Sequence, residues 1–131
     1  MREITLKAGT GASLSVIGFL YYESEARAGC VRNTDLTFSV RTPSDFKETR
    51  WTLDMKEFRR FVKELDALPR TGTAAELREP DHGSFLRFEA DMTVTGELTA
   101  ENGSRIPFRF GGITACDFSL FVYHLKFLIP D

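Results

Sequence analysis

Apolar and polar side chains alternate along most of the second half of the chain. From residue 84 to residue 110 the apolar side chains fall mainly on even-numbered positions: Leu86, Phe88, Met92, Val94, Leu98, Ile106, Phe108 and Phe110. A period of two is typical of strands with one buried and one solvated face. The spacing then changes to three and four, as in an amphipathic helix, over Phe118, Phe121, Val122, Leu125 and Leu128. The pattern predicts a sheet and a closing helix that covers it.

The parity of this pattern also restricts how the strands pair. A two-residue loop would place the apolar residues of neighbouring strands on opposite faces, whereas a three-residue loop keeps them together. A loop at 89–91 would pair Phe88 with Met92 and Leu86 with Val94, unless residues 84–99 form one long bent strand. A loop at 101–103, with Gly103 left-handed, would pair Leu98 with Ile106, Gly96 with Phe108 and Val94 with Phe110. Gly96 would then make room for an aromatic ring.

The first half of the chain predicts further strands at residues 2–7, 13–22, 31–41 and 73–79. The Gly9-Thr10-Gly11 segment fits a hairpin turn better than a phosphate loop, because the Lys-Ser/Thr ending of a P-loop is missing. Residues 23–29 are polar and predict a loop. Residues 42–52 predict a connection anchored by Phe46 and Trp51.

A second helix is predicted from Asp54 to about residue 67. Asp54 and Glu57 have the spacing of a capping box, and Pro69 is expected to end the helix. The buried stripe comprises Met55, Phe58, Phe61, Val62 and Leu65. The outer face carries Lys56, Arg59, Arg60 and Lys63, which would suit an acidic partner or phosphates, or form an ordinary solvated face interleaved with Glu57 and Glu64. The closing helix, at about 115–129, would be capped by Thr114 or by Asp117.

These elements predict one α+β domain spanning residues 1–131. Its expected core is an antiparallel meander sheet of about six to eight strands, with one face covered by helices at about 54–67 and 115–129. A chain of 131 residues with twelve phenylalanines can build such a core without a disulfide or a metal.

Charge and composition predict a cytoplasmic protein. The net charge of −2 favours neither nucleic acid nor an anionic membrane. No segment approaches the roughly 18 apolar residues of a membrane span. Residues 1–7 alternate and carry charge, unlike an export signal. Cys30 and Cys116 are accordingly expected to be reduced thiols.

The sequence predicts no catalytic residue, metal site or cofactor. His82 and His124 have no second histidine or cysteine at ligand spacing, and no serine stands in a nucleophile elbow. An alternative is a small enzyme or ligand-binding domain whose site assembles in the fold around Cys30, Cys116 or His124.

The odd-numbered face of the predicted sheet is the candidate partner-binding surface. Its residues include Arg87, Thr95, Glu97, Arg105 and Arg109, with Thr95 opposite Arg109 in the predicted register. Arginine is enriched in protein interfaces. The alternative is an ordinary solvated sheet face with paired charges. Nucleic-acid stacking is not favoured, since Phe85 is the only aromatic residue on this face.

The order of parts resembles the WapI-type family of small bacterial immunity proteins. The likeness covers about residues 31–128 and rests on Trp51-Thr52-Leu53-Asp54, Phe58, Leu65, Val94, Gly96, Leu98, Ile106-Pro107-Phe108 and Asp117-Phe118-Ser119-Leu120. The family's Asp-Gln-Ser stands here as Asp117-Phe118-Ser119. The resemblance implies a non-enzymatic cytoplasmic protein that neutralises a cognate toxin, often a nuclease. A structural or oligomerisation module is the remaining alternative, and either a monomer or a homodimer is expected.

Overall fold

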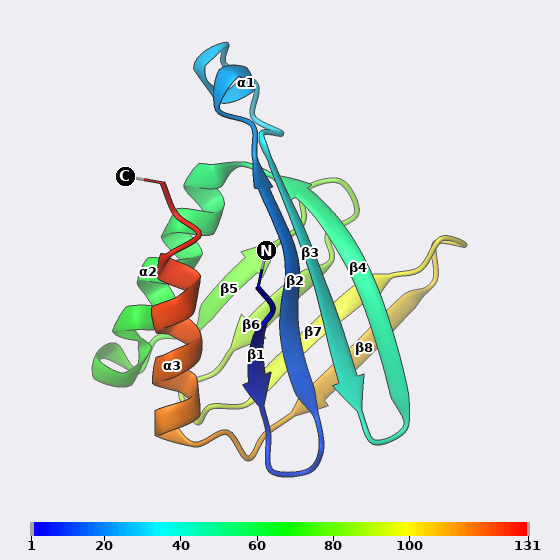
Figure 1. Cartoon of the computed structure of the whole chain (residues 1–131). Coiled ribbons are helices and arrows are strands. Elements are labelled where there is room, and N and C mark those ends of the chain that lie inside the picture. The colour runs from blue at the N-terminus through cyan, green and yellow to red at the C-terminus, as the bar shows by residue number, and fades with distance from the viewer. Residues whose placement is uncertain (1, 131) are drawn as a thin grey trace.

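Two antiparallel sheets form the frame of the molecule in the computed structural model, which describes residues 2–130 (Figure 1). The first sheet contains β1 (Ile4–Lys7), β2 (Ser13–Tyr21), β3 (Thr34–Thr42) and β4 (Asp45–Leu53), and the second contains β5 (Ala75–Arg78), β6 (Phe85–Phe88), β7 (Val94–Thr99) and β8 (Arg105–Phe110). Each sheet is a meander in chain order. The α+β class is confirmed for this part of the chain; the predicted domain also included Met1 and Asp131, which lie outside it.

The prediction of one sheet is wrong, because a long helix separates the two meanders. After β4 the chain enters α2 (Met55–Thr71), and β5 then begins a new sheet whose strands run obliquely behind the first (Figure 1). α2 packs against β5, α3 (Ala115–Lys126) packs against β1, and the two helices contact each other. The helices therefore contact both sheets along one side of the molecule instead of covering one shared face.

The core lies where both sheets and both long helices meet. One small apolar cavity is lined by side chains from all four parts: Leu14, Val16, Leu36, Phe38, Phe58, Phe61, Leu77, Leu86, Phe121 and Leu125. Phe88 is fully buried, with its ring 6.0 Å from both Phe61 and Phe118. The many phenylalanines thus join the helices to the second sheet.

Both long helices start at predicted capping residues, but both end elsewhere than predicted: α2 runs past residue 67, and α3 ends at Lys126 instead of about residue 129. The Asp54 carboxylate accepts from the Lys56 backbone N–H at 3.0 Å, and the Thr114 hydroxyl accepts from the Asp117 N–H at 3.1 Å. Pro69 does not end α2, which continues to Thr71. A proline inside a helix loses its own N–H bond and crowds the carbonyl four residues earlier, but α2 continues past it and stops at Gly72, whose φ of 68° gives a left-handed cap.

The predicted pairing of β7 with β8 is confirmed in full, including Leu98 with Ile106 and a left-handed Gly103 (φ 83°). The β6–β7 pairing keeps the predicted parity but shifts, because Phe88 faces Val94. The Glu89 N–H donates to the Thr93 carbonyl at 2.9 Å, so the three-residue loop is 90–92. It begins one residue later than predicted, since Met92 (φ 66°) occupies the left-handed position that Gly103 holds in the next hairpin.

Gly96 makes room for a ring, as its pairing predicted. A Cβ atom built on Gly96 would lie 2.3 Å from Cζ of Phe108 and 2.5 Å from the backbone oxygen of Phe85. Such distances are far inside van der Waals contact, so this position requires glycine.

The stretch predicted as a connection is a nine-residue strand, β4, at the edge of the first sheet. Its charged sequence is typical of an edge strand, where charges discourage pairing with other chains. Trp51 is buried, as an anchor should be, but Phe46 is 48% exposed beneath the Arg41 guanidinium. The polar segment after β2 contains the short helix α1 (Glu23–Arg27) rather than loop alone.

None of the helices within residues 2–130 is both long enough and apolar enough to cross a membrane.

Candidate functional site

The five residues predicted as a partner surface lie together on the outer face of the second sheet. Strand pairing places Arg87, Thr95 and Arg109 in one cross-strand row. Glu97 lies in the next row, opposite Phe85 on β6 and Pro107 on β8. Arg105 stands opposite Thr99 at the end of the same face. Their odd numbering produces this arrangement, because side chains two apart on a strand share a face.

Acidic neighbours already engage two of the three arginines of this face, Arg87 and Arg105. Arg87 Nε lies 2.5 Å from Glu89 Oε1, and its guanidinium also approaches Glu76 at 3.7 Å. Arg105 Nη1 lies 3.2 Å from Glu97 Oε1. Exposed pairs of this kind contribute little to stability, but a partner would have to compete with them.

The pKa values of Arg87, on this face, and of Asp91, in the loop beside it, are shifted by neighbouring side chains. The hydrogen bond to Glu89 is the main cause that raises the pKa of Arg87, and the Coulomb attraction of that carboxylate adds to it. The pKa of Asp91 is lowered by hydrogen bonds from Thr93, with a smaller contribution from the charge of Arg109. The structure thus brings the five residues together on a largely self-paired face, and their role in binding stays a prediction.

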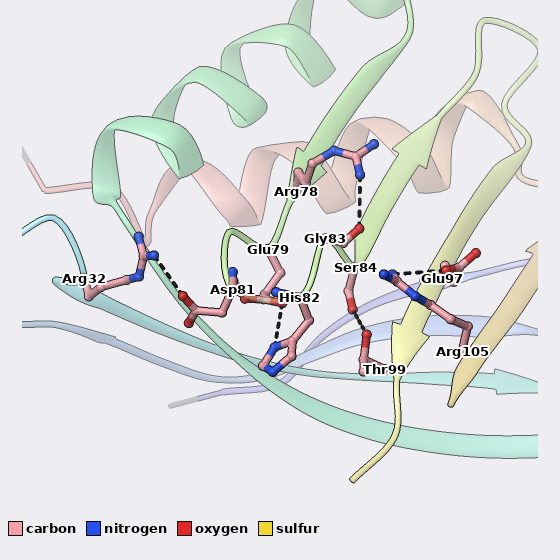
Figure 2. A network of polar contacts seen from close by, with 10 residues as sticks. All are labelled: Arg32, Arg78, Glu79, Asp81, His82, Gly83, Ser84, Glu97, Thr99 and Arg105. Atoms are coloured by element: carbon pink, nitrogen blue, oxygen red, sulfur yellow. Dashed lines mark hydrogen bonds and ion pairs between the residues drawn. The ribbon is translucent and has the colours of Figure 1, made fainter. Parts of the chain in front are cut away.

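The turn between β5 and β6 uses its polar groups to hold its own shape (Figure 2). Glu79 is only 4% exposed, and its carboxylate accepts from the His82 backbone N–H at 2.8 Å, while His82 Nδ1 lies 3.2 Å away. The Ser84 and Thr99 hydroxyls are 2.6 Å apart, and Arg32, in the segment before β3, donates to the Asp81 carboxylate at 2.8 Å. These contacts account for the turn and for the position of His82.

The residues of the alternative site do not share a cavity. Cys30 and Cys116 are both free and exposed, and His124 is exposed on α3. The cavity that contains Cys30 is lined by neither of the other two. Within residues 2–130, no group of three or more histidine, cysteine or acidic side chains is arranged to hold a metal.

The outer face of α3 carries an exposed apolar stripe, which we call the α3 stripe: Leu120, Tyr123 and Phe127. These side chains are 51%, 55% and 71% exposed, respectively. Their spacing of three and four places them on one side of the helix. The buried side chains of α3 occupy the opposite side and are Phe118, Phe121, Val122 and Leu125.

The stripe is ordered by its own contacts as well as by the helix. The rings of Tyr123 and Phe127 meet edge to face, with centroids 5.0 Å apart. A helix with apolar side chains on opposite sides is typical of one that is covered on both. β1 and α2 pack against α3, and Phe88 of the second sheet contacts its inner rings Phe118 and Phe121. The outer side stays exposed, so the α3 stripe is a candidate docking surface.

Sequence reasoning missed the stripe, although its signal was present. Phe118, Phe121 and Leu125 satisfy the three-four spacing of one amphipathic face, and Leu120, Tyr123 and Phe127 form a second set with the same spacing. A helix with apolar side chains on opposite sides shows little difference in hydrophobicity between its two faces. Such a pattern indicates that both faces make contacts.

Comparisons with protein-family models, with curated proteins and with solved structures give no match to this chain.

Proposed function

We propose that this chain is a stoichiometric binding protein, most concretely an immunity protein that neutralises a cognate bacterial toxin in the cytoplasm. The observation that carries the proposal is the α3 stripe, a row of exposed apolar side chains on a helix whose opposite side is packed into the core. Exposed apolar rows of this kind mark protein–protein contact sites. Tyrosine at the centre of the row suits the role, since tyrosine is enriched among the residues that dominate binding energy.

The shape of the surface favours a protein partner over a small ligand. Leu120 and Phe127 are seven residues apart on a helix, which corresponds to about 10 Å along its axis. A protruding helix with anchors at these intervals fits into an apolar groove on another protein. The proposed mechanism is occlusion: the partner's groove receives α3, and the bulk of the two sheets behind it blocks access to the toxin's active site.

Growth protection tests the proposal. Cells that produce the toxin domain encoded beside this gene should survive when this chain is produced with it, and the purified pair should form a complex with one copy of each protein. A toxin that still kills at equal protein levels, or a failure of the two proteins to associate, would overturn the proposal. A homodimer that covers α3 and excludes the toxin would assign the stripe to self-association instead.

A further inference from the structure

A groove of about 740 Å³ lies between α2 and the segment that carries α1. In Figure 1, α1 stands beyond the end of the sheets, next to the beginning of α2. One wall comes from residues 21–33 and the other from residues 54–67. The groove therefore opens on a different helix from the α3 stripe and shares no residue with it.

Positive charge dominates the groove. Its lining includes the predicted basic face of α2, Lys56, Arg59, Arg60 and Lys63, together with Arg27 from α1. Asp54 and Glu64 are the acidic residues of the lining. Five cations against two carboxylates leave an excess of three positive charges, although the whole chain has a net charge of −2.

Three of these five cations, Lys56, Arg59 and Lys63, form no ion pair within residues 2–130. Arg27 contacts Glu23 at 2.5 Å, and Arg60 contacts Glu64 at 2.7 Å. Arg59 donates to the Pro130 carbonyl at 3.2 Å, so the two lysines are the cations most available to a partner. Both lysines are exposed. They are seven residues apart, so their positions on the helix are separated by about 10 Å.

Apolar side chains form the rest of the walls. Val31 is exposed, and Tyr21, Ala26 and Ala67 are partly exposed. A polyanion with phosphates along its whole length would place some phosphates against these apolar side chains and against the carboxylates of Asp54 and Glu64. Both contacts are unfavourable. A peptide that alternates acidic and apolar residues complements both kinds of wall, because its carboxylates and its apolar side chains each find matching partners.

We propose that this groove binds an extended acidic peptide segment of a partner protein. In an extended chain three residues span about 10 Å, so carboxylates at positions i and i+3 match the separation of Lys56 and Lys63. An apolar side chain between them contacts Val31. The groove is separate from the α3 stripe, and peptide binding there does not depend on whether the chain neutralises a toxin.

Binding of synthetic peptides tests this site. The probe is a fluorescein-labelled nonapeptide with aspartate at positions 1, 4 and 7 and valine or leucine between them, and its control carries asparagine at those three positions. Fluorescence anisotropy should show saturable binding of the aspartate peptide, at least tenfold weaker binding of the asparagine peptide, and weakening as salt is raised. Lys56→Glu and Lys63→Glu should each weaken binding at least tenfold, whereas Arg70→Glu, on the same helix outside the groove, should change it less than twofold.

The two exposed cysteines locate the bound peptide. Cys30 lines the groove and Cys116 does not. Saturating peptide should slow maleimide labelling of Cys30 several-fold and leave the labelling of Cys116 unchanged. No saturable binding at millimolar peptide, unprotected Cys30 in the bound state, or tighter competing binding by a single-stranded oligonucleotide would each overturn the assignment. Thermal melting of each variant verifies that it remains folded.

Discussion

Single residues decide the geometry of the hairpins, and two of them show what sequence can predict. Gly96 was predictable, because its partner in the register was a large ring. Met92 was not, since a left-handed non-glycine residue is uncommon and methionine gives no local signal for it. One such residue moved the β6–β7 loop by one position while the alternation kept its parity.

Replacement of Gly96 with alanine should destabilise the protein by about 2–3 kcal/mol, within the range expected for overpacking a filled core. The new methyl group would meet the Phe108 ring and the backbone of β6, and the backbone cannot move aside without breaking the sheet. Urea unfolding measures the free energy. Gly111→Ala is the matched control, because the nearest atom to its added carbon is 3.9 Å away. Equal effects of the two substitutions would contradict the tight approach of Phe108.

At the scale of elements, alternation predicted the strands of the second sheet, and three-four spacing predicted both long helices. β4 was missed because its solvated edge position allows a charged sequence that lacks alternation. The division into two sheets was also missed. Local periodicity shows which side of a strand is buried, but it does not show which strands share a sheet.

The same limits apply to the candidate sites. The predicted surface residues lie on one face, because strand pairing follows the alternation of buried and exposed positions. They are Arg87, Thr95, Glu97, Arg105 and Arg109. Their ion pairs depend on rotamers that sequence does not give. One wall of the groove comes from the segment that contains α1, for which the sequence predicts a loop, and the sequence identifies only the four basic residues of α2 in the other wall.

Asn33 joins two elements and should be sensitive to substitution. Its buried amide donates to the Cys30 carbonyl at 2.9 Å, and its oxygen accepts from the Met55 backbone N–H at 2.9 Å. Asn33→Ala should therefore cost about 1–3 kcal/mol, since it leaves the buried Met55 N–H without its partner. It should also speed amide exchange around α1.

Asn102→Ala provides the comparison for Asn33. Asn102 also accepts a backbone hydrogen bond, from Ser104 at 2.9 Å, but it lies in an exposed loop where water can replace it. Its loss should cost less than about 0.5 kcal/mol. Chemical denaturation measures both variants, and a similar cost at the two positions would show that Asn33 does not hold α1 to α2.

At the scale of the whole molecule, the packing of two sheets against two helices leaves α3 partly outside the core. Phe118, Phe121 and Leu125 face inward, while the α3 stripe remains exposed on the opposite side. Because burial of the outer side contributes nothing to the fold of one isolated copy, its apolar residues favour a role in association. The α3 stripe therefore carries the proposal that the protein acts by binding a partner.

Calorimetric titration of the toxin domain with this chain tests that claim most directly. Tyr123→Asp places a charge at the centre of the α3 stripe and should weaken binding about 30-fold or more, as expected for an anchor that contributes about 2 kcal/mol. Phe46→Asp makes the same kind of change at another exposed aromatic residue, on β4 and away from α3, and should leave the affinity within about threefold. Binding that is unchanged by Tyr123→Asp, in variants that melt like the original protein, would contradict docking through α3.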